Sequence, residues 1–385
     1  MYNFDKVFDR HGTEVIKWDR MQKDFGRDDL IPLGIADMDF EVLPEIKDAL
    51  VDRSAHPTYG YTYASEAYYD SFIAWNKKRN NFEVKKEQML PIPGIVCANS
   101  FILYALTEPG DKIMVTSPVY DPFYAVIRQQ KRTEVRSSLK WDGEKYVMDF
   151  EDMEKKMADG VKMLILCSPH NPVGRVWTRE ELEKVDELCA KYNVLVFSDE
   201  IHCDLIYPGH KHIPYPCISE HAAQNSIIAM APSKTFNLAG LKSSILISQN
   251  PEILAKVNEA VTVFHIGVNA FGFKATEVAY TYGEQWADEL VAYLYENAKF
   301  VKNFVETEMP LVKTYIPDGT YLMWLDFSAY GLDQETLVQK VIDAGVAPND
   351  GEHYGEEGKG FLRVNIGTQR CRLEEGMKRL KAAFC

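Results

Sequence analysis

Short apolar runs alternate with amphipathic stretches through the middle of the chain, from about residue 86 to residue 250. Apolar runs of this length are typical of buried strands, and they predict strands at residues 112–116, 161–167, 194–198, 226–230 and 243–248. Residues 178–192 predict a helix, because their apolar side chains fall on one face and Thr178 can cap the first turn. Strands that alternate with helices predict a mostly parallel sheet that is covered on both faces.

The pattern changes after residue 250. Helical periodicity continues to about residue 308, and two further strand and helix pairs follow, at 321–327 with 334–344 and at 361–366 with a last helix from Leu373. This order is typical of a smaller α+β unit, with which we expect the first 45 residues to pack. We therefore predict an α/β fold with a large domain over residues 46–285 and a small domain built from residues 1–45 and 286–385.

Composition narrows the class of protein. The 385 residues are 46% hydrophobic and 26% charged, which is ordinary for a soluble globular protein. The net charge of −14 argues against nucleic acid or an anionic membrane surface as a partner, because both select basic patches. No apolar run approaches the ~20 residues of a membrane span. The seven cysteines lack metal-ligand spacing, and residues 1–10 lack an apolar signal segment, so we expect free thiols, no bound metal and a cytoplasmic location.

Three segments carry residues that suit the chemistry of pyridoxal 5'-phosphate (PLP). Lys234 follows a short apolar run and precedes a glycine-bearing turn, as expected of a catalytic Schiff-base lysine that also moves the substrate's proton. Asp199 ends a predicted strand, where open α/β sheets place ligands. Asn171 begins the sequence Asn-Pro-Val-Gly. Asp199 and Asn171 each have an ordinary alternative role in a turn, but with Lys234 they supply the parts that PLP binding requires.

Each of these residues could meet one physical requirement of cofactor binding. A buried carboxylate at Asp199 would keep the ring nitrogen protonated, so that the ring can accept electrons. Asn171 could donate a hydrogen bond to the phenolate oxygen. His202, three residues after Asp199, could approach the same side of the ring, although a lone histidine is more often structural.

The cofactor phosphate requires an anion site. We expect it at the start of the helix that follows Gly94, where the N–H groups near Ile95 and Val96 and the helix dipole attract negative charge. Ser233 would add a hydroxyl and Lys242 a cation, whose alternative role is that of a surface charge.

Two further residues have candidate roles at the ring and at the substrate. Tyr120 follows a predicted strand and could stack on the ring, or it could be a core aromatic. Arg363 lies inside an otherwise apolar strand, where a buried guanidinium needs an anionic partner. The α-carboxylate of an amino-acid substrate would satisfy it in a bidentate clamp, and a structural salt bridge is the alternative.

Motifs spread over essentially the whole chain resemble one enzyme family. They lie at residues 10–13 (Arg-His-Gly-Thr), 36–40 (Ala-Asp-Met-Asp-Phe), 59–61 (Tyr-Gly-Tyr), 199–205 and 233–241. The chain is similar to fold-type I PLP enzymes of the class I/II aminotransferase group. Within that group it resembles the MalY/PatB branch, the C–S lyases related to cystathionine β-lyase.

The resemblance carries further implications. It implies a homodimer with shared active sites, in which Tyr59 reaches the cofactor phosphate of the neighbouring subunit. It also implies that Arg363 anchors the substrate carboxylate and that the segment around Asp37 lies at the substrate. The branch usually has Trp-Val where this chain has Gly34 and Ile35, so the preferred size of substrate is open.

The resemblance implies a C–S β-lyase that cleaves L-cystathionine, or a similar thioether of L-cysteine, to a thiol, pyruvate and ammonia. The same residues would serve an aminotransferase of amino acids, which would pass the amino group to a keto acid instead. A protein used mainly for binding or regulation is a third interpretation. The motifs therefore define the cofactor better than they define the outcome of the reaction.

Overall fold

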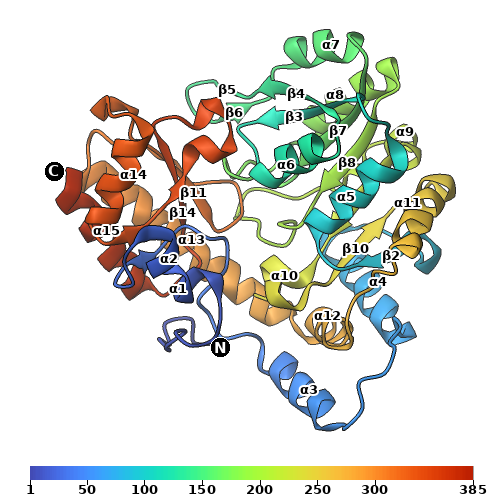
Figure 1. The fold of residues 1–385 in the computed structure, drawn as a ribbon, viewed down its shortest axis with the longest axis horizontal. Helices are drawn as coiled ribbons and strands as arrows, with labels where there is room; N and C mark the ends of the chain where they lie inside the picture. Colours follow the sequence, from blue (N-terminus) through green and yellow to red (C-terminus); the bar gives the residue numbers. More distant parts are fainter. Residues whose placement is uncertain (385) are drawn as a thin grey trace.

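A seven-stranded sheet forms the centre of the protein in a computed structural model that describes residues 1–384 (Figure 1). Every strand except β10 runs in the same direction, because β10 pairs antiparallel with both of its neighbours. The order across the sheet is β2 (Met89–Ile92), β10 (Ser244–Ile247), β9 (Ser226–Met230), β8 (Leu195–Asp199), β7 (Val161–Cys167), β3 (Lys112–Ser117) and β4 (Thr133–Ser138). The predicted mostly parallel sheet is confirmed.

Helices cover both faces of this sheet. Side chains of β7 alternate between the two sides: Met163 and Ile165 belong to one apolar cluster, and Leu164 and Leu166 belong to the other. The first cluster contains helices α5 (Ile95–Leu106), α6 (Asp121–Gln129) and α11 (Pro251–Val263). The second includes α4 (Glu66–Asn80), α7 (Phe150–Ala158), α8 (Arg179–Tyr192), α12 (Ala270–Tyr282) and α13 (Glu284–Glu308). Burial on both sides explains why the central strands are continuous apolar runs.

The predicted helix at 178–192 is confirmed as α8. Thr178 caps it by accepting a hydrogen bond from the N–H of Glu181, and the Glu181 carboxylate accepts one from the N–H of Thr178. The five predicted strands are also present, whereas the edge strands β2 and β4 were missed. β2 contains Pro91, and β4 is largely polar, so neither resembles a buried strand in the sequence.

The C-terminal part builds a second, smaller layer of structure. A three-stranded antiparallel sheet has the order β11 (Leu322–Asp326), β14 (Phe361–Asn365) and β13 (Asn349–Asp350). Helices α14 (Gln334–Asp343) and α15 (Arg370–Phe384) lie beside it (Figure 1).

The N-terminal segment joins this smaller part. The short strand β1 (Ile31–Pro32) pairs in parallel with β12 (Val346–Ala347), near the short helices α1 (Ile16–Asp19) and α2 (Met21–Phe25). Helix α3 (Pro44–Ala55) then leads away toward the lower edge of the view (Figure 1). The domain boundaries at residues 45 and 285 stay a prediction. No helix within residues 1–384 combines the length and the apolarity that crossing a bilayer requires.

Candidate functional site

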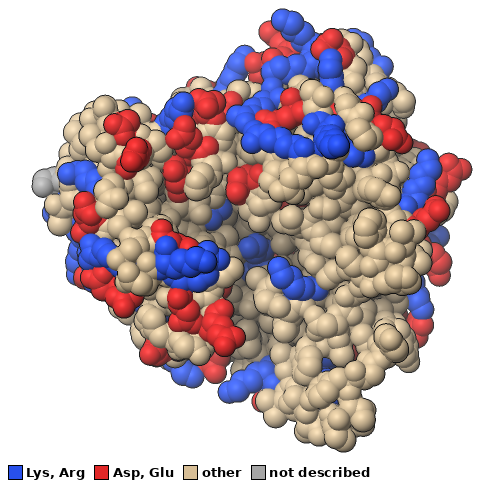
Figure 2. Space-filling model, in the orientation of Figure 1, with Lys and Arg blue, Asp and Glu red and all other residues tan. Residues whose placement is uncertain are grey.

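A cavity of about 450 Å³ opens between the large sheet and the smaller C-terminal part. Figure 2 shows this face hollowed near its centre, with basic side chains at the hollow. The cavity brings together side chains from the carboxyl ends of several parallel strands, which is where open α/β sheets bind ligands. Eleven of the sequence-predicted site residues line it: Gly94, Ile95, Val96, Tyr120, Asn171, Asp199, His202, Ser233, Lys234, Lys242 and Arg363.

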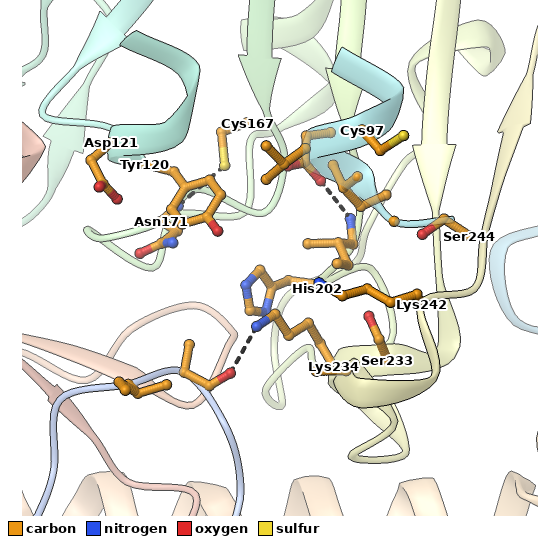
Figure 3. A pocket seen from close by; sticks show the side chains of 18 of the residues that line it. Cys97, Tyr120, Asp121, Cys167, Asn171, His202, Ser233, Lys234, Lys242 and Ser244 are labelled. Atoms are coloured by element: carbon orange, nitrogen blue, oxygen red, sulfur yellow. Dashed lines mark hydrogen bonds between the residues drawn. The ribbon is translucent and has the colours of Figure 1, made fainter. Parts of the chain in front are cut away.

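Lys234 lies in the short helix α10 (Pro232–Thr235), directly after β9. Its Nζ donates a hydrogen bond of 2.7 Å to the carbonyl oxygen of Ala36 (Figure 3). Burial, and after it the nearby charge of Arg363, lower the pKa of Lys234 to about 8, against the opposing effects of Asp37 and Asp199. The amine is therefore much closer to losing its proton at neutral pH than that of a surface lysine.

Asp199 is the last residue of β8, and its side chain is buried. One hydrogen bond reaches the carboxylate from within residues 1–384, from the backbone N–H of Ile201 at 3.1 Å. Burial raises the pKa of Asp199 to about 7, and that single N–H and the charge of Lys234 offset only part of the effect. A cationic N–H placed beside this carboxylate would stabilise its ionised form.

His202 and Asn171 present unused polar atoms to the cavity. His202 is buried, and its Nδ1 has no hydrogen-bond partner among the described residues. Burial holds the pKa of His202 well below its usual range, so the ring is neutral. Asn171 accepts a hydrogen bond of 3.1 Å at Oδ1 from Nη1 of Arg363. That bond fixes the orientation of the amide and leaves its N–H₂ group to donate.

The anion end of the cavity is the start of α5. Gly94 caps this helix with a φ of 101°, a conformation that side chains rarely tolerate. The cap residue carries no side chain over the first N–H groups of the helix, and a Cβ built there would lie 3.9 Å from Cδ of Lys242. Lys242 and Ser233 line the same region of the cavity (Figure 3). Helix N–H groups, a hydroxyl and a cation together suit a phosphate.

Tyr120 and Arg363 lie on the other side of the cavity. Tyr120 immediately precedes α6, and burial raises its pKa to about 12. Arg363, in β14, is buried and donates through Nη2 to the carbonyl oxygen of Gly34 at 2.8 Å. Its guanidinium lies over the ring of Tyr354, 5.1 Å from the ring centre, and its Nε has no partner within residues 1–384. A donor thus remains for an anion.

Two residues expected at the site do not line this cavity. Tyr59 is exposed, and its hydroxyl donates to the carbonyl oxygen of Ser54 at 2.8 Å. The carboxylate of Asp37 accepts two hydrogen bonds of 3.1 Å from Arg10. Their expected contacts with the neighbouring subunit's phosphate and with the substrate stay predictions.

A set of buried polar side chains lies behind α10, on the side away from the cavity. Asp204 accepts hydrogen bonds from Nε1 of Trp75 at 2.9 Å and from the hydroxyl of Thr235 at 3.0 Å. Arg79 places its Nε 3.7 Å from the same carboxylate. Thr235 directly follows Lys234, so Asp204 holds the helix that carries the lysine. The sequence offered one signal for Asp204, its place in the motif at 199–205.

The sequence interpretation assigned no role to several other residues that line the cavity. Asp121 had a usable signal, because it directly follows Tyr120 after a predicted strand. Ile35 and Ala36 lie in the segment expected near the substrate, and Cys97 and Ile201 lie in segments expected at the cofactor. Asn349 and Tyr354 come from segments that only tertiary packing brings to the site.

The residues present suit PLP. An amine with a lowered pKa, an under-partnered carboxylate and a helix N-terminus line one cavity, and each corresponds to one chemical group of the cofactor. The fold and the site together define a PLP-dependent enzyme of fold type I.

Comparison with known proteins gives the family. The profile of the family aminotransferase class I and II matches residues 28–380, and the chain belongs to this family. The chain is 42% identical to cystathionine beta-lyase PatB of Bacillus subtilis, over 99% of this chain and 100% of the relative. The PLP-containing structure of cystalysin from Treponema denticola is 33% identical with a TM-score of 0.96, over 100% and 98% of the two chains. The PLP-bound C-S lyase from Staphylococcus hominis is 32% identical with a TM-score of 0.93, with the same coverage. The resemblance to the MalY/PatB branch is confirmed.

Proposed function

We propose that the protein is a PLP-dependent carbon–sulfur β-lyase that cleaves L-cystathionine to homocysteine, pyruvate and ammonia. One observation carries the chemistry: a half-buried amine of lowered pKa, Lys234, shares a cavity with the carboxylate of Asp199 and with a buried arginine that has a spare donor. The relatives that are named cystathionine beta-lyase and C-S lyase support β-elimination as the outcome.

The proposed holding roles follow from the geometry. Asp199 would lie beside the ring nitrogen of bound PLP, Asn171 would donate to its phenolate oxygen, and Tyr120 would cover one face of the ring. His202 would approach the ring from the same side as Asp199. The start of α5, where Ile95 and Val96 follow Gly94, would hold the phosphate together with Ser233 and Lys242.

Bound PLP supplies an electron-withdrawing ring that stabilises negative charge at the substrate's Cα. Arg363 binds the α-carboxylate and fixes the amino acid in one orientation. Lys234 then removes the Cα proton with its neutral amine, which a pKa of about 8 makes accessible near neutral pH. The Cβ–S bond breaks, sulfur leaves with the bonding electron pair, and water converts the remaining fragment to pyruvate and ammonia.

Aminotransferase activity is the second candidate, because the matching family is named for that reaction and the site residues serve both. In that case the amino group would move to a keto acid and no thiol would be released. The two reactions differ in what happens after the Cα proton has left, which the positions of Lys234 and Asp199 do not decide.

We further propose a cytoplasmic homodimer with shared active sites. The segment after α3 exposes three aromatic side chains, Tyr59, Tyr61 and Tyr63, which a second subunit could cover. The proposed contact of Tyr59 with the partner's phosphate fits this exposure. The large domain is proposed to span residues 46–285, and the small domain residues 1–45 and 286–385.

Release of pyruvate and thiol from L-cystathionine tests the function. The PLP-loaded protein is assayed without any keto acid, and we expect equal amounts of pyruvate and homocysteine. No release of either product, with amino-group transfer once a keto acid is added, would replace the lyase by the aminotransferase.

A further inference from the structure

Asp121 is a cavity-lining carboxylate that the proposed reaction does not use. It is the first residue of α6, next to Tyr120, and it is exposed to the cavity. Figure 3 shows it on the side of Tyr120 and Asn171, away from Lys242 and Ser233. No other residue within 1–384 forms a hydrogen bond or an ion pair with its side chain, and partial burial raises its pKa against the opposing effect of its own backbone N–H.

The other acidic residues around the site have partners. Asp199 receives the N–H of Ile201. A neighbouring cavity of about 280 Å³ shares Ile35 and Asn349 with the main one, and two more acidic residues line it. There, Asp24 pairs with Arg20 at 2.8 Å, and Asp350 accepts from Gln334 at 2.6 Å and from the N–H of Glu352 at 2.9 Å. Among these carboxylates of the described chain, Asp121 alone has no partner from another residue.

The charge of Asp121 acts on the proposed substrate anchor. The titratable and charged side chains that act on Asp121 are His353, an exposed residue that lines the neighbouring cavity, and Arg363, the proposed carboxylate anchor. A carboxylate whose charge is felt at the anchor also repels the carboxylate of every amino-acid substrate. The repulsion is offset only for a substrate that also brings a cation, because an ammonium group can form a charge-assisted hydrogen bond with Asp121. Such an arrangement discriminates between substrates.

We propose that Asp121 recognises an ammonium group on the distal, thiol-side part of the substrate. The preferred substrates are then thioethers of L-cysteine whose leaving thiol itself carries an amino group. This inference rests on the proposed lyase function. It assigns Asp121 to substrate selection, with no part in moving the Cα proton.

Two substrates that differ in one group test the assignment. L-Cystathionine carries the distal ammonium, and S-(3-carboxypropyl)-L-cysteine is the same molecule without it. We expect the wild-type enzyme to cleave L-cystathionine with a kcat/KM about 10- to 100-fold higher, as one charge-assisted hydrogen bond allows. Equal values of kcat/KM for the two substrates would overturn the role of Asp121. No product from either substrate would instead overturn the proposed function.

The variant Asp121→Asn keeps the shape of the side chain and removes its charge. We expect kcat/KM for L-cystathionine to fall about 10- to 100-fold, mainly through KM, while kcat/KM for the carboxypropyl substrate stays within about 3-fold. A matched control is Asp24→Asn, since Asp24 is a nearby carboxylate that already has a partner, and the substrate ratio should not change there. An equal loss for both substrates in Asp121→Asn would show a structural role and overturn the proposal.

Discussion

Two buried carboxylates five positions apart, Asp199 and Asp204, differ in how many partners the fold gives them, although burial raises the pKa of both. They are 3% and 4% exposed, so burial alone does not distinguish them. Asp204, behind α10, has Trp75, Thr235 and Arg79 as partners. Asp199, at the cavity, has one backbone N–H.

The difference separates structural from chemical groups. A buried charged group with several partners holds neighbouring elements together. A buried charged group with too few partners lowers the stability of the fold, and it is typical of sites where a ligand supplies the missing partner. The same contrast applies to the neighbours Lys234 and Thr235, of which the first faces the cavity and the second faces Asp204. We therefore expect substitutions on the cavity side to lower activity and substitutions behind α10 to lower stability.

Replacing the cavity-side lysine should have the largest effect. Lys234→Ala removes the proposed base for the Cα proton, and we expect turnover of L-cystathionine to fall about 1,000-fold or more, with little change in the unfolding midpoint of the cofactor-free protein. Pyruvate release and urea unfolding measure the two quantities. Substantial β-elimination in the variant would remove Lys234 from the mechanism.

Asp199→Asn should follow in magnitude. The amide cannot balance a protonated ring nitrogen, so we expect kcat to fall roughly 100-fold and PLP to bind more loosely. Turnover and cofactor retention during dialysis are the measurements. Kinetics near those of the wild-type enzyme would place Asp199 outside the chemistry.

Replacing Asp204, the carboxylate behind α10, should affect the stability of the fold more than the rate of the reaction. Asp204→Ala leaves Trp75, Thr235 and Arg79 without their shared partner, and we expect a loss of about 3 kcal/mol in the free energy of unfolding. The matched control is Asp288→Ala, which removes an exposed partner of the same arginine, and it should cost less than about 1 kcal/mol. Equal losses in the two variants, measured by urea unfolding, would contradict the contrast.

The pH dependence of stability offers a test without turnover. With a pKa of about 7 in the folded protein against 3.8 for a free carboxyl, Asp199 keeps its proton when folded and loses it when unfolded between about pH 4 and pH 7. The folded state binds more protons there, so this group lowers stability as the pH rises, by an amount on the order of 1–4 kcal/mol. The cofactor-free wild type should therefore lose stability relative to Asp199→Asn over this range. The prediction is wrong if the difference in urea midpoint between the wild type and Asp199→Asn is the same at pH 5 and at pH 7.

The smallest effect is expected from Thr235→Val. The substitution keeps the shape of the side chain and removes one hydrogen bond to Asp204, which should cost about 1 kcal/mol in unfolding free energy and less than 10-fold in kcat. Thr235→Ser should restore most of the loss. A collapse of activity comparable with that of Lys234→Ala would show that position 235 acts in the chemistry directly.

The sequence predicted the parts of the fold that depend on local pattern. Buried parallel strands are apolar throughout, and Thr178 and Glu181 form the N-terminal capping box of α8, so the sequence predicted these elements. The edge strand β2 was missed because its Pro91 argues against a strand.

The site divides in a similar way. Residues at strand ends, such as Asp199 and Lys234, could be found from their positions. Partners supplied by distant segments could not: Gly34 reaches Arg363 across 329 positions of the chain, and Trp75 reaches Asp204 across 129. No local pattern encodes which side chains such packing brings together.

If Arg363 is the carboxylate anchor, as proposed, its hydrogen bonds have a consequence for the thermodynamics of substrate capture. Asn171 and Gly34 hold two of its nitrogens, and Tyr354 supports the plane of the guanidinium. A long side chain that is already immobile loses almost no rotamer entropy when the carboxylate arrives. The Arg363 side chain is ordered once, when the chain folds. The conformational entropy lost at each binding event is therefore mainly that of the substrate. A more rigid substrate analogue should consequently bind Arg363 with higher affinity.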